Sequence, residues 1–333
     1  MERLTIESRC IANNLLGDPT TRDVQVYLPE GYDDSGRHYP LLVFLAGFTG
    51  SGQKLLSWQS FGENVPQRID RLVEGGAMGP VIGLFPDTFT SLGGNQYVNS
   101  AALGNWDDFL REEMIPAVEA AFRVRPGAAH RAVLGKSSGG YGAIVQGLLH
   151  GDSWGAVACH SGDMGFDWCY RPDLPKLLVQ LARHENDIPR FVEHVAGARK
   201  IGGDEFYALM LLAMGACYDP DPSAPLGLRL PVDPHTCELD DERWSAWLEH
   251  DPLRMIERTE CQESLRRLSG LFIDCGSGDQ YNLQFTARAF TRRLTGLGIE
   301  HVYEEFDDNH SGLDYRMDRS LPLLWEKIAT PRD

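Results

Sequence analysis

Ser137 lies in a sequence pattern that is typical of a serine nucleophile. Residues 134–140 read Leu-Gly-Lys-Ser-Ser-Gly-Gly, so G-x-S-x-G stands directly after an apolar run and before a helical pattern. A nucleophile at a tight turn from strand to helix has a strained backbone, and the positions two before and two after it must be glycine. Gly135 and Gly139 meet that demand, and the free N–H groups of the following helix favour developing negative charge. The alternative is a Gly/Ser-rich connection without chemistry, which the placement after an apolar strand disfavours.

A serine hydroxyl becomes a good nucleophile only when a base removes its proton, and a carboxylate must orient that base. In enzymes with this turn, the partners follow along the chain in the order Ser, acid, His. Asp279 lies in a Gly-rich loop after an apolar run and is the predicted acid, whereas Asp274 lies inside that run and is the alternative. His310 is the predicted base, because it alone among the ten histidines follows a final core strand.

Acyl transfer also needs hydrogen-bond donors for the oxyanion of the tetrahedral intermediate, each worth roughly 3 kcal/mol. The backbone N–H of Ser138, directly after the nucleophile, is one predicted donor. The other is the N–H of Phe48 in the loop 46–50, which follows the apolar run 41–45. A plain glycine turn is the alternative role of that loop. Ser138 is the weaker candidate for the nucleophile, because Lys136 rather than glycine stands two residues before it.

Short apolar runs alternate with longer helical patterns, which is typical of a mainly parallel sheet with helices on both faces. Several runs are apolar throughout, as expected of strands buried on both sides. The predicted strands are 24–28, 41–45, 81–85, 132–135, 156–159, 271–275 and 301–306. The predicted helices are 105–122, in which Pro116 starts or kinks a segment, 139–149, a buried helix at 206–217, and 283–297.

The alternation breaks between about Met164 and Arg258, where Pro-rich loops separate helical pieces. We therefore predict an α/β catalytic core formed by residues 1–163 and 259–333. A largely helical, cap-like insertion at 164–258 is expected to pack over one edge of the sheet and to form part of the pocket wall. A chain of 333 residues is long enough for this arrangement, since a typical domain has about 150 residues.

The composition excludes several classes of partner. Lys and Arg total 31 and Asp and Glu total 48, and the net charge of −17 argues against nucleic acid and anionic membrane surfaces. The first residues are charged and lack the apolar core of a secretory signal, so a cytoplasmic protein is predicted. The seven cysteines are scattered without a metal-binding cluster and are expected to be reduced thiols. Oligomeric state, including a homo-oligomer, is left open.

Residues in strand-end loops and in the insertion are the candidates for substrate contact, with ordinary packing as the alternative for each. We take as contacts Trp58, Tyr97 and Trp168, with Phe61, Asn99 and Tyr170 as further candidates. Asp163 and Asp167 lack the ligand pattern of a metal site, so neither a metal nor another cofactor is predicted. Lys136, beside the nucleophile, is either simply solvated or a cation that favours anionic acyl groups.

The chain resembles the α/β-hydrolase superfamily, and in particular its putative-esterase branch, which includes esterase D (S-formylglutathione hydrolase), enterobactin-type esterases and the mycolyltransferases. The resemblance rests on Tyr39-Pro40 leading into Leu41–Gly50, on Phe85–Thr88, on Gly135–Ala143, on Gly278-Asp279 and on Asn309-His310. It implies the α/β-hydrolase fold. It also implies that Ser137, Asp279 and His310 correspond to the catalytic triad, and Phe48 with Ser138 to the oxyanion donors.

We therefore expect a serine hydrolase that cleaves small carboxylic esters through an acyl-enzyme and needs no cofactor. One alternative keeps the chemistry and changes the substrate: an acyltransferase, or a thioesterase for a glutathione adduct of the S-formylglutathione type. An alternative of a different class is a non-catalytic binding module on a hydrolase fold. The presence of all three triad residues in the expected chain order disfavours it. Two features depart from the family pattern, Ala46-Gly47 where many relatives carry His-Gly, and the insertion 164–258, which is absent from compact relatives.

Overall fold

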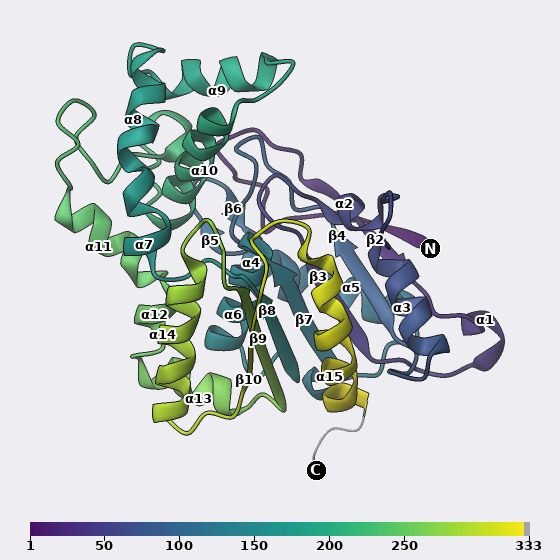
Figure 1. The fold of residues 1–333 in the computed structure, drawn as a ribbon. Helices are drawn as coiled ribbons and strands as arrows, with labels where there is room; N and C mark the ends of the chain where they lie inside the picture. Colours follow the sequence, from purple (N-terminus) through teal and green to yellow (C-terminus); the bar gives the residue numbers. More distant parts are fainter. Residues whose placement is uncertain (330–333) are drawn as a thin grey trace.

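An eight-stranded sheet runs through the middle of the molecule (Figure 1). The computed structural model describes residues 1–329. The strand order is β1-β2-β4-β3-β7-β8-β9-β10. In this sheet β1 and β2 are antiparallel to their neighbours, whereas β4, β3, β7, β8, β9 and β10 run parallel to one another. The strands are β1 (Glu2–Glu7), β2 (Thr21–Tyr27), β3 (Leu41–Leu45), β4 (Ile82–Pro86), β7 (Arg131–Lys136), β8 (Ala156–His160), β9 (Gly270–Gly276) and β10 (Val302–Phe306), with a separate pair β5 (Asn99–Ser100) and β6 (Gly104–Asn105).

Helices follow most strands, as the alternating pattern of the sequence predicts. Outside the segment 164–258 they are α1 (Tyr32–Ser35), α2 (Gly52–Leu56), α3 (Val65–Glu74), α4 (Trp106–Asp108), the π-helix η1 (Phe109–Met114), α5 (Ile115–Ala121), the 3₁₀ turn η2 (Ala128–His130), α6 (Ser138–Leu149), α13 (Thr259–Arg266), α14 (Leu283–Gly296), the 3₁₀ turn η5 (Leu313–Arg316) and α15 (Met317–Ala329).

The central strands are buried on both sides, and alternate residues enter two different cores. Along β3, Leu42 and Phe44 belong to one core cluster, which packs the sheet against α3 and α15 (Figure 1). Leu41, Val43 and Leu45 belong to the other cluster, which packs it against η1, α5, α6 and α14. This alternation explains why the strand reads as continuously apolar.

The predicted helix 105–122 is present but is not uniform. It consists of α4, η1 and α5 in direct succession, with the π-helical stretch immediately before Pro116. Proline has no N–H to bond the carbonyl four residues earlier, so the regular ladder is interrupted and the preceding turn widens. The strand β1, which the sequence did not predict, has only Ile6 buried and forms an edge of the sheet.

The segment 164–258, within the connection from β8 to β9, forms helices and loops. Its elements are α7 (Phe166–Cys169), η3 (Arg171–Asp173), α8 (Leu174–Ala182), α9 (Ile188–Gly197), α10 (Gly203–Tyr218), η4 (Pro225–Gly227), α11 (Asp241–Glu249) and α12 (Pro252–Met255). The buried helix expected at 206–217 is α10. Residues of this connection such as Phe191, Leu212 and Trp247 belong to the same core cluster as Leu41 and Val43, so this helical layer shares its core with the sheet.

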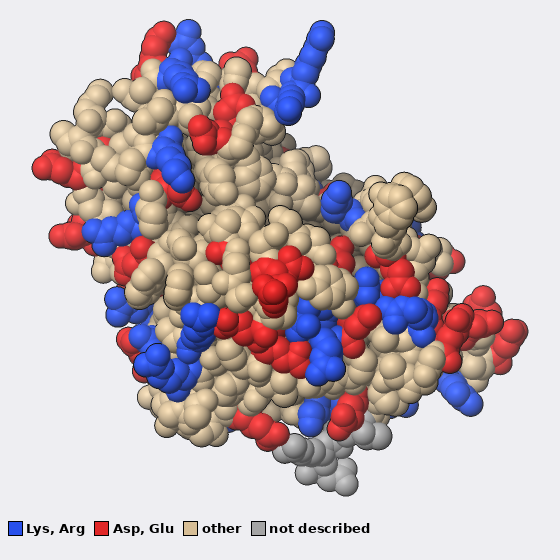
Figure 2. Space-filling model, in the orientation of Figure 1, with Lys and Arg blue, Asp and Glu red and all other residues tan. Residues whose placement is uncertain are grey.

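Charged side chains are mixed in sign over the surface. On the face shown in Figure 2, Lys and Arg are scattered among Asp and Glu and form no continuous basic stripe. That face therefore lacks the continuous basic surface that binds a polyanion. No helix within residues 1–329 is long and apolar enough to cross a bilayer.

Candidate active site

Ser137 occupies a strained turn between β7 and α6. Its backbone has φ 60° and ψ −127°, a region that non-glycine residues rarely adopt. The neighbouring glycines are required by close backbone approach. A Cβ at Gly139 would lie 2.1 Å from the Leu45 carbonyl oxygen, and one at Gly135 would lie 2.5 Å from the Gly139 carbonyl carbon. The G-x-S-x-G spacing thus lets β3, β7 and α6 meet closely and holds Ser137 at the carboxyl end of the sheet.

The loop that follows β3 lies beside this turn. β3 and β7 pair in parallel with Leu45 opposite Gly135, so Phe48 and Ser138 each follow the paired residues by three positions. Within residues 1–329 the backbone N–H groups of Phe48 and Ser138 donate no hydrogen bond. Both amides follow the carboxyl ends of the neighbouring strands β3 and β7, where free backbone N–H groups can serve as donors to an oxyanion.

His310 and Asp279 come from the loops after β10 and β9, which are also parallel neighbours. The His310 Nδ1 and Asp279 Oδ2 atoms are 2.7 Å apart, and Asp279 is only 3% exposed. Asp279 Oδ1 accepts the backbone N–H of Tyr281 at 2.9 Å, which fixes the carboxylate. The Tyr281 ring packs edge-on against His310 at 4.7 Å between ring centroids. The imidazole is therefore held by Nδ1 and one face, and Nε2 remains for another partner.

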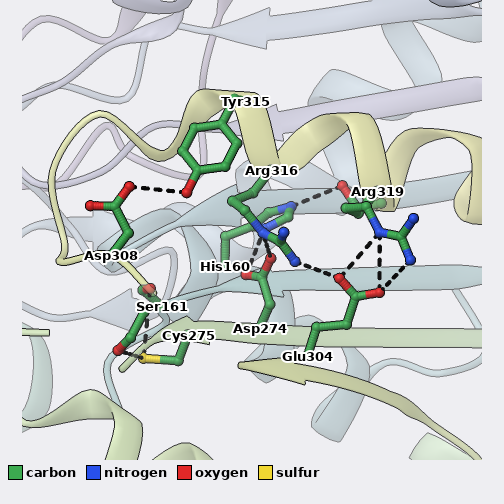
Figure 3. A network of polar contacts seen from close by, with 11 residues as sticks. His160, Ser161, Asp274, Cys275, Glu304, Asp308, Tyr315, Arg316 and Arg319 are labelled. Atoms are coloured by element: carbon green, nitrogen blue, oxygen red, sulfur yellow. Dashed lines mark hydrogen bonds and ion pairs between the residues drawn. The ribbon is translucent and has the colours of Figure 1, made fainter. Parts of the chain in front are cut away.

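The alternative acid, Asp274, belongs to a different network (Figure 3). Its Oδ1 lies 2.8 Å from His160 Nδ1, and its Oδ2 accepts from Arg316 Nε at 2.9 Å. His160 Nε2 in turn lies 2.9 Å from Ser320 Oγ. This buried Ser–His–Asp set lies between the sheet and α15, and none of its members lines the cavity that contains Ser137 and His310. Asp279, not Asp274, is the carboxylate bonded to His310.

Ser137 and His310 line one cavity of about 690 Å³. Within residues 1–329 the Ser137 hydroxyl makes no hydrogen bond, and it does not cap the helix that follows it. The lining comes from both faces of the sheet. From the helical connection and its surroundings come Asp163, Cys169, Tyr170, Phe206, Met210 and Tyr281; from the α2 and α15 side come Lys54, Leu55, Trp58, Gln59, Lys136 and Asp314.

Two of the predicted contacts, Trp58 and Tyr170, line this cavity, and Trp58 is 78% exposed at its rim. Tyr97 lies elsewhere: it is buried behind the loop 46–50 and its hydroxyl donates to the Ala46 carbonyl at 2.6 Å. Its position supports the loop from behind rather than facing the cavity.

The remaining candidates also lie outside the cavity lining. Trp168 is 52% exposed, and its carbonyl accepts from Asn282 Nδ2 at 3.3 Å. Phe61 is fully exposed, and Asn99 lies in β5, where its Oδ1 accepts the backbone N–H of Asp108. Strand-end position alone does not tell which way such a loop residue turns.

Sequence reasoning missed several residues that do line the cavity. Phe206 and Met210 come from α10, whose apolar run indicated a buried helix but not a pocket wall. Tyr281 follows the acid by two residues and packs on His310. Asp163 was weighed only as a metal ligand, and no cluster of three metal-ligating side chains is found within residues 1–329.

Lys136 lines the cavity next to Ser137 and forms no ion pair within residues 1–329. Burial lowers the pKa of its ammonium group, and the carboxylates of Asp314 and Asp279 oppose that effect. A partly desolvated cation therefore faces the side of the cavity that also carries Asp314.

The order of the sheet, the strained serine turn and the paired His and Asp loops define an α/β-hydrolase. The family model described as putative esterase matches residues 19–317. The chain therefore belongs to the putative esterase family, which confirms the predicted fold and family.

Other proteins resemble the chain over part or all of its length. An esterase from Mycobacterium tuberculosis strain H37Rv is 33% identical over 145 residues, which is 42% of this chain; the chain spans only 28% of that relative's length. A ferulic acid esterase structure matches with a TM-score of 0.62 at 19% identity, covering 98% of this chain and 97% of the other. An S-formylglutathione hydrolase from Agrobacterium tumefaciens matches with a TM-score of 0.60 at 14% identity, covering 98% of this chain and 94% of the other. These structural likenesses show the fold.

Proposed function

We propose that this protein hydrolyses carboxylic esters through an acyl-enzyme on Ser137, with His310 as the base and Asp279 as its orienting acid. The observation that carries the proposal is the 2.7 Å bond between Asp279 and His310 on the wall of the cavity that exposes Ser137. The family assignment and the strained serine turn support it.

In the first half-reaction, the Ser137 Oγ–H proton passes to His310 Nε2 while Oγ bonds to the ester carbonyl carbon. The carbonyl oxygen takes the electron pair and becomes an oxyanion, which accepts hydrogen bonds from the Phe48 and Ser138 amides. When the carbon–alkoxy bond breaks, His310 returns its proton to the leaving oxygen and the alcohol departs. Asp279 holds the imidazole in the correct tautomer and stabilises its charged form.

In the second half-reaction, water replaces the alcohol. His310 takes a proton from the water as its oxygen bonds to the acyl carbon, and a second tetrahedral oxyanion forms at the same amides. The bond to Ser137 Oγ then breaks and the serine recovers its proton, which releases the carboxylic acid.

The helical connection 164–258 is proposed to act as the specificity element of this site. It contributes Cys169, Tyr170, Phe206 and Met210 to the cavity lining, so it supplies most of the apolar wall on that side. An apolar wall of this kind buries hydrocarbon parts of a substrate. Shortening or replacing it is expected to change which esters are cleaved while the triad is retained.

The proposal is tested with p-nitrophenyl butyrate and a fluorophosphonate probe. Wild-type protein should hydrolyse the ester and be labelled, whereas Ser137→Ala should do neither. Ser138→Ala, which retains the backbone N–H, is the matched control and should still be labelled. Labelling of Ser137→Ala at full level would refute the assignment. S-Formylglutathione and an added alcohol acceptor in the same assay separate hydrolysis of esters from thioesterase and acyltransferase activity.

A further inference from the structure

Asp163 is a buried carboxyl group in the cavity wall that the mechanism above does not use. It follows β8, is 7% exposed and lines the same cavity as Ser137. One of its oxygens, Oδ2, accepts three hydrogen bonds, from Tyr170 Oη at 2.9 Å, Gln96 Nε2 at 3.2 Å and Ser138 Oγ at 3.3 Å. These donors come from separate parts of the chain and fix the orientation of the carboxyl group.

The second oxygen, Oδ1, accepts no hydrogen bond within residues 1–329 and is not sealed off by protein atoms. Because the donors hold Oδ2 on the protein side, Oδ1 is the oxygen left for the cavity. Burial raises the pKa of Asp163, with the Tyr170 hydrogen bond and the charge of His310 acting against that effect. A bound substrate that displaces water from this oxygen without replacing its hydrogen bond leaves the carboxyl oxygen without a partner, which is costly.

The position of Asp163 limits where its partner can lie. Ser138, whose hydroxyl donates to Asp163, also supplies a proposed oxyanion amide, so the carboxyl group lies one side chain away from the reacting carbonyl. Besides Tyr170, whose hydroxyl already donates to Asp163, the segment 164–258 contributes Cys169, Phe206 and Met210 to the lining, and these side chains offer little competition as hydrogen-bond partners. A hydroxyl group of the substrate on the side of segment 164–258 would therefore find a carboxylate acceptor in Asp163 Oδ1.

We propose that Asp163 Oδ1 accepts a hydrogen bond from a hydroxyl group of the substrate, so that the enzyme selects hydroxylated esters over their unsubstituted analogues. This inference rests on the proposed function and names the substrate class of the same site. The hydroxyl belongs to the acyl part or to the alcohol part of the ester, and the two sources are separated by experiment.

The test compares neutral esters by pH-stat titration with the full-length enzyme. Ethyl butyrate is the reference, ethyl 3-hydroxybutyrate, as separate enantiomers, carries the hydroxyl in the acyl part, and 2-hydroxyethyl butyrate carries it in the alcohol part. One of the hydroxy esters should exceed ethyl butyrate in kcat/KM by about tenfold to a hundredfold, as expected for a hydrogen bond to a carboxylate. Equal kcat/KM values for all three esters would overturn the inference, while hydrolysis of ethyl butyrate would still support the proposed function.

A methyl ether separates donation by the substrate from simple polarity or size. The methoxy analogue of the preferred ester, ethyl 3-methoxybutyrate or 2-methoxyethyl butyrate, cannot donate and should lose the advantage. If the methoxy analogue were as good as the hydroxy ester, Asp163 would not be accepting a hydrogen bond from the substrate. This comparison uses only wild-type enzyme and is independent of the folding of any variant.

Asp163→Asn tests the residue itself. Its amide oxygen would remain toward Tyr170, Gln96 and Ser138, so an NH₂ group would replace the acceptor that faces the cavity. The ratio of hydroxy ester to ethyl butyrate should then fall about tenfold, whereas a merely structural role would lower both rates together. Asp314→Asn, a second carboxyl group of the same cavity on the α15 side, is the matched control and should keep the wild-type ratio. An unchanged ratio in Asp163→Asn would refute the inference.

Discussion

Two buried aspartates, each bonded to the Nδ1 atom of a histidine, allow catalysis and stability to be separated with one kind of substitution. Asp279 lies 2.7 Å from His310 and Asp274 lies 2.8 Å from His160. The two carboxyl groups are 3% and 1% exposed, so burial does not distinguish them. Only His310 shares the cavity with Ser137. Asparagine at the two positions is therefore expected to have opposite effects.

Asp279→Asn should abolish most activity with little loss of stability. An amide cannot stabilise the imidazolium, and it allows the wrong tautomer of His310, which in comparable triads costs about 10⁴ in kcat, or roughly 5.5 kcal/mol of transition-state stabilisation. The amide oxygen can still accept the backbone N–H of Tyr281, which Asp279 Oδ1 bonds at 2.9 Å. The free energy of unfolding should therefore change by only about 1 kcal/mol.

Asp274→Asn should have the reverse effect, because it should lower stability while leaving most of the activity. Its Oδ2 accepts from Arg316 Nε at 2.9 Å. An asparagine NH₂ group at that place would face the Arg316 N–H, so two hydrogen-bond donors would meet without an acceptor. Arg316 keeps its bond to Glu304 but loses its buried partner, which is expected to cost about 3 kcal/mol of stability. Because no member of this network lines the cavity, kcat of the folded variant should stay within about threefold of wild type.

Both variants are measured by kcat for p-nitrophenyl butyrate and by urea denaturation at pH 7.5, beside wild type. The reasoning fails if Asp279→Asn keeps more than about a tenth of the wild-type kcat, or if folded Asp274→Asn loses as much activity as Asp279→Asn.

Three further predictions concern strain, packing and pH. Ser137→Gly should unfold with a free energy about 1 kcal/mol higher than inactive Ser137→Ala, because glycine adopts φ 60° and ψ −127° without strain; equal denaturation midpoints would contradict this. Gly139→Ala would place a Cβ 2.1 Å from the Leu45 carbonyl oxygen and should lower stability by about 3 kcal/mol in thermal unfolding; a wild-type Tm would count against the close approach. Burial lowers the pKa of His250 to about 4, so between about pH 6.5 and 4 the unfolded chain binds a proton that the folded chain does not. The free energy of unfolding is then lost as pH falls, by about 3 kcal/mol at pH 4. Urea denaturation at a series of pH values should show a smaller dependence of stability on pH in His250→Phe, and the same dependence in both proteins would refute the attribution to His250.

The residues of the proposed triad could be selected from the sequence because they depend on local patterns and on one rule of sheet geometry. Ser137 was found from its flanking glycines, and Asp279 and His310 from their positions after apolar strands. Since the carboxyl ends of parallel strands meet at one edge, residues far apart in the sequence converge there. The structure places the Asp279 and His310 side chains in contact, and Ser137 on the same cavity.

The pocket could not be predicted to the same extent, because loop residues depend on tertiary contacts. Tyr97 is turned away from the cavity by its bond to the Ala46 carbonyl, and no local pattern contains that contact. The orientation of Asp163 depends on Gln96, Ser138 and Tyr170, which lie up to 67 positions away in the sequence. Edge strands are similarly weak signals: β1 buries only Ile6 and therefore lacks a clear apolar pattern.

Access to the cavity, rather than the presence of serine, histidine and aspartate, distinguishes the proposed catalytic set from the buried one. His160 and Asp274 stand opposite each other in the parallel pair β8 and β9, so both side chains point to the same face, where α15 covers them and supplies Ser320. Asp279 lies beyond the end of β9, outside the alternation of the strand, and can turn toward the loop that carries His310. Hydrogen bonds of nearly equal length thus join one pair that helps to hold a helix on the sheet and one pair on the cavity that contains the proposed nucleophile. The position of a carboxylate relative to the strand end is what separates these two roles.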